Sequence, residues 1–134
     1  MLQLLDFNEN PSVGVFCRAN DDVAFVQKGL LKRIKKKIVE TLEVELVELS
    51  IADASIVGSL LVINSKGAVV TDFADKDAIN VIKDQGFKVC VISDKINAAG
   101  NDVLVNDKGC LVHPNLMGET IKAVSYTHLR AHET

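Results

Sequence analysis

The chain has 134 residues, of which 48% are apolar and 25% charged; this fits one globular domain with a modest core and excludes a disordered protein. The formal net charge of −3 argues against general affinity for nucleic acid, and no apolar run approaches the roughly 20 residues that span a bilayer. The N-terminal residues show neither a basic lead nor a small-residue cleavage site, so we expect no secretion signal, no membrane partner and a cytoplasmic location.

Three segments of the chain align without gaps around a glycine and an asparagine six residues apart. They run from Gly14 to Asn20, from Gly58 to Asn64 and from Gly100 to Asn106. Successive copies are offset by 44 and 42 residues, a regularity that indicates an internal repeat. The glycine that begins each copy predicts a close backbone approach or a bend at the start of a strand.

Each of the three asparagines opens a tight turn, because Asn tolerates left-handed backbone angles and its side chain bonds the amides that follow. In the second copy, apolar residues 60–63 and 68–70 flank the turn, which predicts a β-hairpin. Gly67 and Gly109 end the second and third turns, where glycine accepts positive φ at no steric cost. The strands are apolar throughout, which predicts burial on both faces.

A helix and a further strand are expected after each hairpin. In the first copy an apolar stripe with helical spacing precedes a strand at residues 44–49, and its members are Leu31, Ile34, Ile38 and Leu42. In the second copy Asp75 is suited to cap a helix through Ala78, Ile79 and Ile82 that ends near Gly86, before a strand at residues 87–92. The third copy reaches a helix at residues 119–124.

The repeated unit is therefore strand, turn, strand, helix and strand over about 43 residues. Such a unit cannot bury its own apolar face, so the units must stack or close around an axis. We expect an α/β propeller with the helices outside, built from units at residues 1–50, 51–93 and 94–124. Residues 125–134 hold the only tyrosine and two of the three histidines and continue no pattern, so we expect them to be a non-native tail.

Three segments carry a resemblance to a known family: NPSVGVFCRAND, ADASIVGSLLVINSKGAVV and NAAGNDVLVNDKGCLVHPNL. In this order they resemble the first three repeats of translation initiation factor 6, in its archaeal form, and the resemblance covers residues 1–124. It implies the pentein fold, a closed α/β propeller of five units, with about three present here.

The same resemblance implies a function without catalysis. A factor of this family binds the large ribosomal subunit, takes part in its maturation and prevents its association with the small subunit. The implied partners are a ribosomal protein on the intersubunit face and nearby ribosomal RNA. No cofactor, metal, catalytic residue or small-molecule substrate is implied, and the full-length protein would be a monomer.

The pentein architecture also hosts hydrolases of guanidino groups that use a Cys nucleophile, so an enzyme is the alternative. Cys110 and His113 are the candidates, but on one strand residues three apart point to opposite faces. Cys17, Cys90 and Cys110 each lie in an apolar stretch without metal-ligand spacing, which favours reduced, buried thiols.

Two groups of polar residues are candidates for ribosome binding. Lys28, Lys32, Lys35 and Lys36 fall on one predicted helical face, which is either a solvated surface or a contact with RNA phosphates. Asn97 and Asn101 bracket Gly100, and Asn101 stands where the second unit has Ser59. These two asparagines are either turn formers or contacts for a ribosomal protein, since loops at one end of a repeat assembly commonly bind partners.

Overall fold

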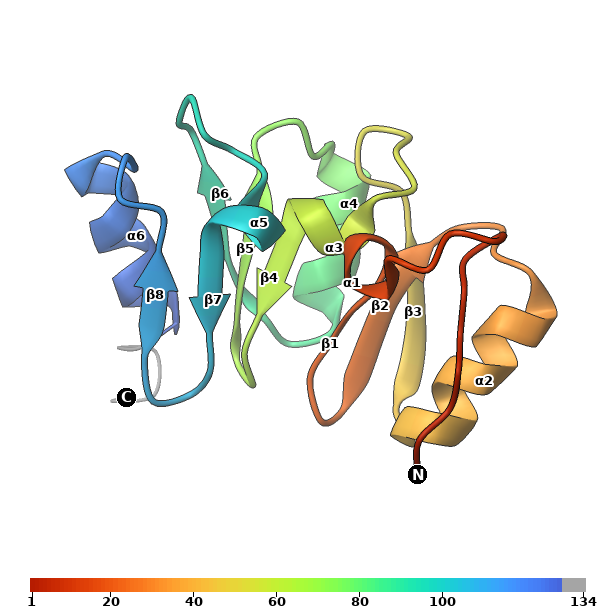
Figure 1. Ribbon diagram of the computed structural model, residues 1–134. Coiled ribbons are helices and arrows are strands. Elements are labelled where there is room, and N and C mark those ends of the chain that lie inside the picture. Colours follow the sequence, from red (N-terminus) through yellow and green to blue (C-terminus); the bar gives the residue numbers. More distant parts are fainter. Residues whose placement is uncertain (129–134) are drawn as a thin grey trace.

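The computed structural model describes residues 1–128, in which short and long helices alternate with short strands (Figure 1). The elements in chain order are α1 (Val13–Phe16), β1 (Arg18–Ala19), β2 (Val23–Gln27), α2 (Lys32–Leu42), β3 (Glu45–Leu49), α3 (Val57–Leu60), β4 (Leu61–Ile63), β5 (Gly67–Thr71), α4 (Lys76–Asp84), β6 (Lys88–Ile92), α5 (Ala99–Asp102), β7 (Val103–Val105), β8 (Cys110–Val112) and α6 (Gly118–His128). None of the described helices is long and apolar enough to cross a membrane.

Each repeat forms a small sheet of its own. The sheets have the strand orders β1-β2-β3, β4-β5-β6 and β7-β8. In every copy the first two strands form the predicted antiparallel hairpin, and in the first two copies a third strand pairs parallel to the second. In the pairings Phe25↔Val47 and Val69↔Cys90 the middle strands correspond at an offset of 44 residues and the third strands at an offset of 43, so the predicted repeat and its hairpins are confirmed.

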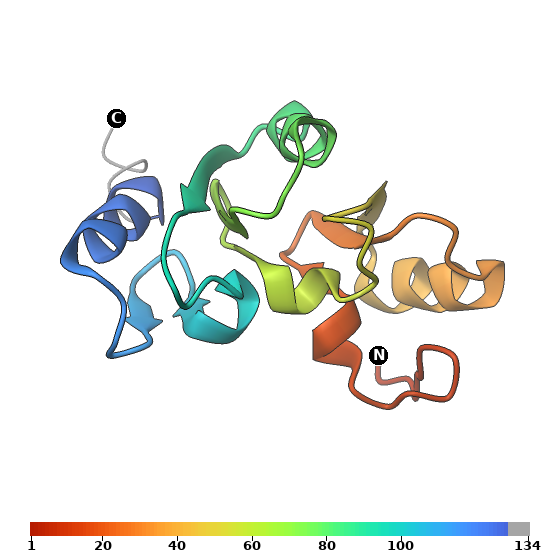
Figure 2. The same ribbon diagram turned by 90° about the horizontal axis from the view of Figure 1, so that it is seen from above.

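The predicted propeller is wrong for this chain. The three sheets lie side by side in an open arc, with α5, α3 and α1 along the front and α4 and α6 behind (Figures 1 and 2). The described residues do not close around an axis. The physical reason is that stacking in a row covers the apolar faces between neighbouring sheets, while residues 1–128 supply no further sheet that would complete a ring.

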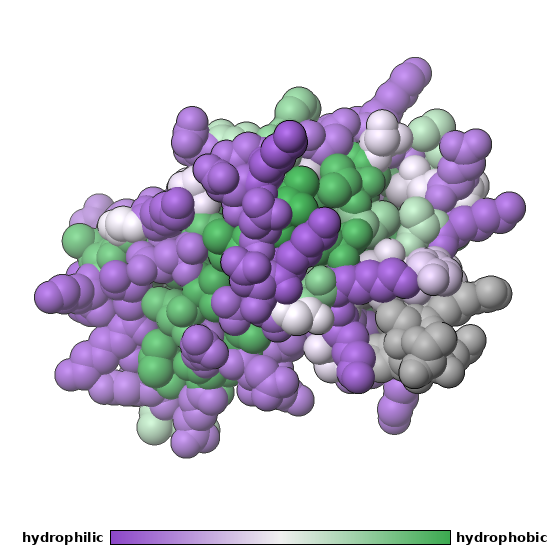
Figure 3. All heavy atoms as spheres, turned by 180° about the vertical axis from the view of Figure 1, so that it is seen from behind, coloured by the Kyte–Doolittle hydropathy of each residue, from purple (hydrophilic) through white to green (hydrophobic). Residues whose placement is uncertain are grey.

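Two apolar clusters fill the joints between the sheets. The first lies between the first and second sheets and includes Phe25, Leu49, Leu61 and Ile82 of α4. The second lies between the second and third sheets and is closed by Val124 of α6. Seen from behind, apolar residues show between the polar side chains that cover this face (Figure 3).

Burial on both faces, predicted for all the strands, holds for residues 23–26 of β2 in the first sheet and for β4 and β5 in the second. All five residues of β5 are buried, because the first unit covers one face of that sheet and the third unit covers the other. In the third sheet Leu104 and Leu111 are exposed, since no described residue packs on their side. For these strands the prediction was therefore wrong.

The repeat glycines lie in one-turn helices and not at strand starts. Gly14, Gly58 and Gly100 belong to α1, α3 and α5, whereas the sequence predicted a strand from residue 60. A short apolar run does not by itself distinguish helix from strand. The predicted close approach is confirmed at two of the three: a Cβ at Gly58 would overlap the carbonyl oxygen of Gly14, and one at Gly100 would overlap that of Gly58.

The longer helices follow their predicted signals more closely. The Asp75 side chain accepts a hydrogen bond from the Ala78 amide at 3.1 Å, and Gly86, at φ +92°, follows the end of α4. In α2, Ile34 and Ile38 are buried as expected. The outer members of the predicted stripe, Leu31 and Leu42, are half exposed, because Leu31 precedes the helix and Leu42 ends it.

Helix α6 extends beyond its predicted end at Val124 to His128. Within this extension Thr127 is buried, and the Lys88 Nζ lies 3.6 Å from the centroid of the Tyr126 ring. Residues 129–134 of the expected tail lie outside the described residues. That residues 125–134 are non-native, and that the unit boundaries fall at 50/51 and 93/94, stay predictions.

The glycine contacts generate a paired test. Gly58→Ala places a methyl group against backbone oxygens that cannot rotate away, so we expect the free energy of unfolding to fall by about 1–3 kcal/mol. Gly14→Ala is the control, because nothing lies within 4 Å of its Cβ position and alanine favours a helix. Urea unfolding of both variants measures the difference. Equal stability of the two would contradict the proposed packing.

Candidate functional site

Arg18 links all three units on the side where the short helices lie. Its Nε donates to the Leu61 carbonyl at 3.1 Å, and its Nη2 donates to the carbonyls of Gly58 and Gly100, the latter at 3.1 Å. Burial lowers the pKa of the guanidinium. A single side chain thus satisfies backbone oxygens from α3, β4 and α5 that converge at the joint.

Sequence reasoning missed Arg18. Under the repeat offsets it stands where the other units have Val62 and Leu104. A charged residue at a position that is apolar in the other copies is the signal that could have found it. Asp102 gives the same signal, because the equivalent residues are Phe16 and Leu60. Its Oδ2 is buried and has no hydrogen-bond partner among residues 1–128, and burial raises the pKa of this carboxyl.

The turn asparagines have two roles. Each Oδ1 accepts from the amides two and three residues later, as in the bonds from Lys66 and Gly67 to Asn64 at 3.0 and 2.8 Å; this supports their predicted place in the turns. The Nδ2 of Asn20 donates to the Asn64 carbonyl at 3.0 Å, and that of Asn64 to the Asn106 carbonyl at 3.4 Å. The same residue therefore forms its own turn and ties it to the next unit.

Asn97 and Asn101 both lie at the third short helix. The Asn97 side-chain amide donates to an Asp72 carboxylate oxygen at 2.9 Å, which fixes the loop before α5 to the end of β5. Asn101 is exposed on α5, whereas its counterpart Ser59 on α3 is buried between neighbouring units. The structure thus leaves the Asn101 amide open to solvent, and its role in binding stays a prediction.

The predicted basic face is only partly a helix face. Helix α2 begins at Lys32, so Lys28 lies on the connection before it. Lys35 pairs with Glu48 of β3 at 3.5 Å, and Lys36 pairs with Glu40 at 3.8 Å. Lys28 and Lys32 are exposed and have no ion pair among the described residues. The basic surface therefore offers fewer uncompensated charges than the sequence indicated.

The Cys–His alternative is not favoured. Cys110 lies in β8, and His113 follows that strand, where its Nδ1 accepts from the Asn115 amide at 3.0 Å. Burial raises the pKa of the Cys110 thiol, whereas a nucleophilic cysteine needs its pKa lowered by a neighbouring base or cation. All three cysteines are free thiols; Cys90 is buried, the other two are half-buried, and burial raises the pKa of Cys17 to about 11. Residues 1–128 contain no group of side chains suited to hold a metal ion.

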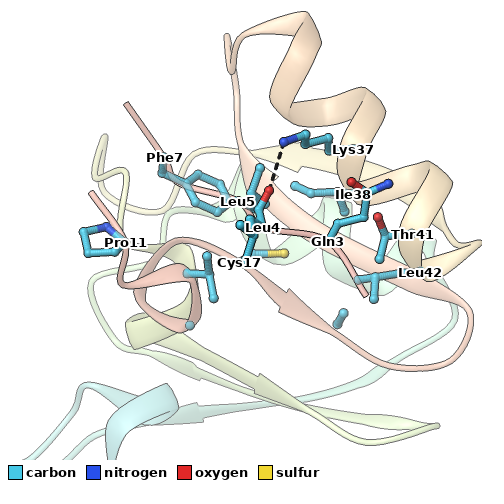
Figure 4. A pocket seen from close by; sticks show the side chains of 13 residues that line it. Gln3, Leu4, Leu5, Phe7, Pro11, Cys17, Lys37, Ile38, Thr41 and Leu42 are labelled. Carbon is cyan, nitrogen blue, oxygen red and sulfur yellow. Dashed lines mark hydrogen bonds between the residues drawn. The ribbon is translucent and has the colours of Figure 1, made fainter. Parts of the chain in front are cut away.

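An apolar cavity of about 480 Å³ lies at the outer end of the first unit (Figure 4). It is bounded by the N-terminal segment, α1 and α2, and its lining includes Leu5, Cys17, Ala19, Ile38 and Leu42. The Lys37 Nζ donates to the Leu4 carbonyl at 2.9 Å and holds the segment over the cavity. The lining offers contact area and no acid–base pair, so the cavity suits packing and not catalysis.

Asp94 fixes the start of α6 to the end of the second unit. Its carboxylate accepts hydrogen bonds from the Met117 amide at 3.0 Å, the Thr120 hydroxyl at 2.9 Å and the Ile96 amide at 3.3 Å. The Met117 bond is the largest cause of a pKa below the ordinary value for this carboxyl. Because α6 closes the second apolar cluster, Asp94 helps to position the third unit.

Comparison with known proteins identifies relatives along most of the chain. A family model described as the eIF-6 family matches residues 2–129. Translation initiation factor 6 of Methanopyrus kandleri is 36% identical over 115 residues, which are 86% of this chain and 52% of that protein. The factor of the same name from Methanocorpusculum labreanum is 34% identical over 112 residues, 84% of this chain and 50% of the relative. The chain spans about half the length of these curated relatives.

Removing the guanidinium of Arg18 tests the link between the units. Arg18→Met keeps the aliphatic stem but leaves the carbonyls of Gly58, Leu61 and Gly100 without their donor. We expect a loss of about 2 kcal/mol or more in the free energy of unfolding, measured by urea unfolding. A variant as stable as the native chain would show that water replaces these bonds at no cost.

The Asp94 contacts predict a dependence on pH. A carboxyl whose pKa is lowered in the folded state adds stability above its ordinary pKa of about 3.9 and loses it as the pH falls through the folded value. Asp94→Asn should therefore be less stable than the native chain at pH 7, and the gap should close in acid. Thr120→Val, which removes one of the bonds, should show a smaller gap. The test is to measure the free energy of unfolding of the native chain and both variants from pH 7 to pH 2. A difference in stability that does not change with pH would contradict the role assigned to the Asp94 carboxylate.

Proposed function

Because the chain belongs to the eIF-6 family, we propose that it acts as a translation initiation factor that binds the large ribosomal subunit and prevents its association with the small one. The observation that carries the proposal is the family match over residues 2–129. Relatives from several archaea bear the name translation initiation factor 6. Such a factor works by occupying a surface, so it needs no cofactor or small-molecule substrate, and it acts in the cytoplasm, where subunits join.

The binding surface that we propose lies around α5 and includes Asn97 and Asn101. Two contacts hold this surface rigid before any partner arrives. The Arg18 guanidinium bonds the Gly100 carbonyl next to Asn101, and Asp72 holds the Asn97 side chain. A rigid surface loses little conformational freedom on binding. Exposed amides that both donate and accept hydrogen bonds suit a protein partner on the intersubunit face.

Ribosomal RNA beside that protein partner would meet basic side chains. Lys32 is the better candidate for a phosphate contact, because it is exposed and forms no ion pair among the described residues. Lys28 also forms no such ion pair, but it lines a pocket with Asp53, Asp75 and Asp77. Lys35 and Lys36 each have a glutamate partner, which reduces the gain from meeting a phosphate. We therefore propose that Lys32, with Lys28 before it, supplies phosphate contacts on the first unit, apart from the surface around α5.

Co-sedimentation with purified archaeal ribosomal subunits tests the proposal. The chain should sediment with free large subunits and not with small subunits or joined ribosomes. Asn97→Ala combined with Asn101→Ala should weaken binding by about ten-fold or more if these residues are central to the contact. Asn80→Ala is the matched control, since Asn80 is an exposed asparagine on α4. In the same assay Lys32→Ala should lower the dependence of binding on salt more than Lys36→Ala.

Two results would contradict parts of this proposal. Binding of the native chain to joined ribosomes as strongly as to large subunits would refute occlusion of the subunit interface. Full binding by the double asparagine variant would place the contact on another face while leaving the ribosome as partner. The Asn101→Ala variant alone should unfold at the same urea concentration as the native chain, because Asn101 is exposed and lies outside the apolar clusters. Asn97→Ala also removes the hydrogen bond to Asp72, so the single Asn101 variant separates lost binding from lost stability.

A further inference from the structure

A carboxyl group lies in the joint between the second and third units, at a position that is apolar in the other units. Helix α5 packs against α3, β4 and β5 of the second unit (Figure 1), and Asp102, its last residue, is only 9% exposed. The counterpart Leu60 packs against the apolar cluster of the preceding joint. In the first unit the counterpart Phe16 stacks on Phe7, with the ring centroids 5.3 Å apart.

Two further titratable residues lie in the same joint. Ile51 and Asp94 are each the second residue after the third strand of a sheet; Ile51 is buried in the first apolar cluster, whereas the third unit has a carboxylate there. His113 follows β8 and stands where the second unit has Thr71. Its backbone amide donates to the Asp102 carbonyl at 2.8 Å, which places the two residues side by side.

The two carboxyl groups differ in how they are satisfied. Asp94 accepts several hydrogen bonds, whereas the Oδ2 of Asp102 is buried and has no partner among residues 1–128. Burial is the largest cause of an Asp102 pKa above the ordinary value; a charge on His113 lowers this pKa, and the Asp94 carboxylate raises it. Ionised Asp102 is therefore a buried charge whose desolvation is not repaid by hydrogen bonds.

His113 is the cation that faces Asp102. The elements packed on α5, namely α3, β4, β5 and β7, carry no titratable residue. Arg18 reaches α5, but its hydrogen bonds go to the carbonyls of Gly58, Leu61 and Gly100. The His113 Nδ1 accepts from the Asn115 amide at 3.0 Å, so neutral His113 carries its hydrogen on Nε2 and becomes charged by adding a second at Nδ1.

We propose that Asp102 and His113 form a pH-sensitive switch in the joint between the second and third units. When Asp102 is ionised and His113 is neutral, the buried charge loosens α5 on the second unit. Protonation of His113 balances this charge and protonation of Asp102 removes it, so α5 packs more tightly as the pH falls. Because Asn101 precedes Asp102, the order of the surface around α5 follows the pH. The proposal does not depend on ribosome binding.

Replacing Asp102 tests the sign of the effect. A carboxyl whose pKa is raised in the folded state costs stability above that folded value, and the cost disappears as the pH falls to the ordinary pKa of about 3.9. Relative to Asp102→Asn and to Asp102→Leu, the unfolding equilibrium constant of the native chain should fall by about five-fold or more between pH 8 and pH 4. Urea unfolding measures both ratios. A ratio that does not change with pH overturns the proposal.

Asp94→Asn is the matched control for net charge. It removes one negative charge from the same joint, as Asp102→Asn does. Because hydrogen bonds lower the pKa of Asp94, the native chain should lose stability relative to Asp94→Asn as the pH falls. The two variants should therefore shift in opposite directions. A shift in the same direction would reflect the charge of the whole chain and overturns the proposal.

His113→Gln tests the facing charge. Histidine ordinarily gains its positive charge as the pH falls from 8 to 5, whereas glutamine gains none. At pH 5.5 the substitution should destabilise the native chain more than it destabilises Asp102→Asn, and at pH 8 its effect should be the same in both. Loss of the Asn115 hydrogen bond is common to both backgrounds and cancels. A coupling that is absent at pH 5.5, or equal at both pH values, overturns the proposal.

Amide hydrogen exchange locates the switch. The Asn101 amide donates to the Ala98 carbonyl at 2.8 Å, and the equivalent Ser59 amide of α3 donates to the Ile56 carbonyl at 3.0 Å. After correction for the intrinsic effect of pH on exchange, protection at Asn101 should rise by about five-fold from pH 8 to pH 5 in the native chain and stay constant in Asp102→Asn. Protection at Ser59 should change less. An equal change at Ser59 and Asn101 overturns a switch confined to α5.

Discussion

The close approach of backbone to backbone where one repeat meets the next is the constraint on which the rest of the structure depends. At Gly58 and Gly100 the preceding glycine carbonyl occupies the space of a side chain, so only glycine allows the units to come this near. The approach turns carbonyl oxygens toward one point, where water has little access and each needs a donor. Arg18 supplies that donor to three of them. The spacing of the sheets, and with it the apolar clusters between them, follows from this joint.

The polar ladder at the turns reinforces the same spacing from the other end of the sheets. Because one asparagine shapes its own turn and also donates to the next, the local requirement of the hairpin and the long-range requirement of stacking fall on a single residue. This explains why Asn recurs where Asp or Gly could also form a turn. A carboxylate would accept the local amides but has no hydrogen to donate to the neighbouring carbonyl.

Equivalent positions differ in exposure because the units differ in their neighbours. Ser59 is buried between two units, and its counterpart Asn101 faces solvent. Val62 is buried, while Leu104 is exposed and Arg18 is drawn into the joint. The surface proposed to meet a ribosome therefore arises from the position of a unit in the row. The repeat pattern in the sequence does not by itself predict which of these equivalent positions are exposed.

The sequence by itself determined the features whose causes lie within a few residues: the repeat period, the hairpins with their asparagine turns, the Asp75 cap and the buried stripe of α2. It also carried the family resemblance. It could not decide that residues 57–60 form a helical turn, that Lys28 lies outside α2, or that three units form an open arc. The open arc and the role of Arg18 rest on contacts between residues as far as 40 and 82 positions apart. Only the tertiary structure decided them, because their energies come from packing and hydrogen bonds that exist only once the units stack.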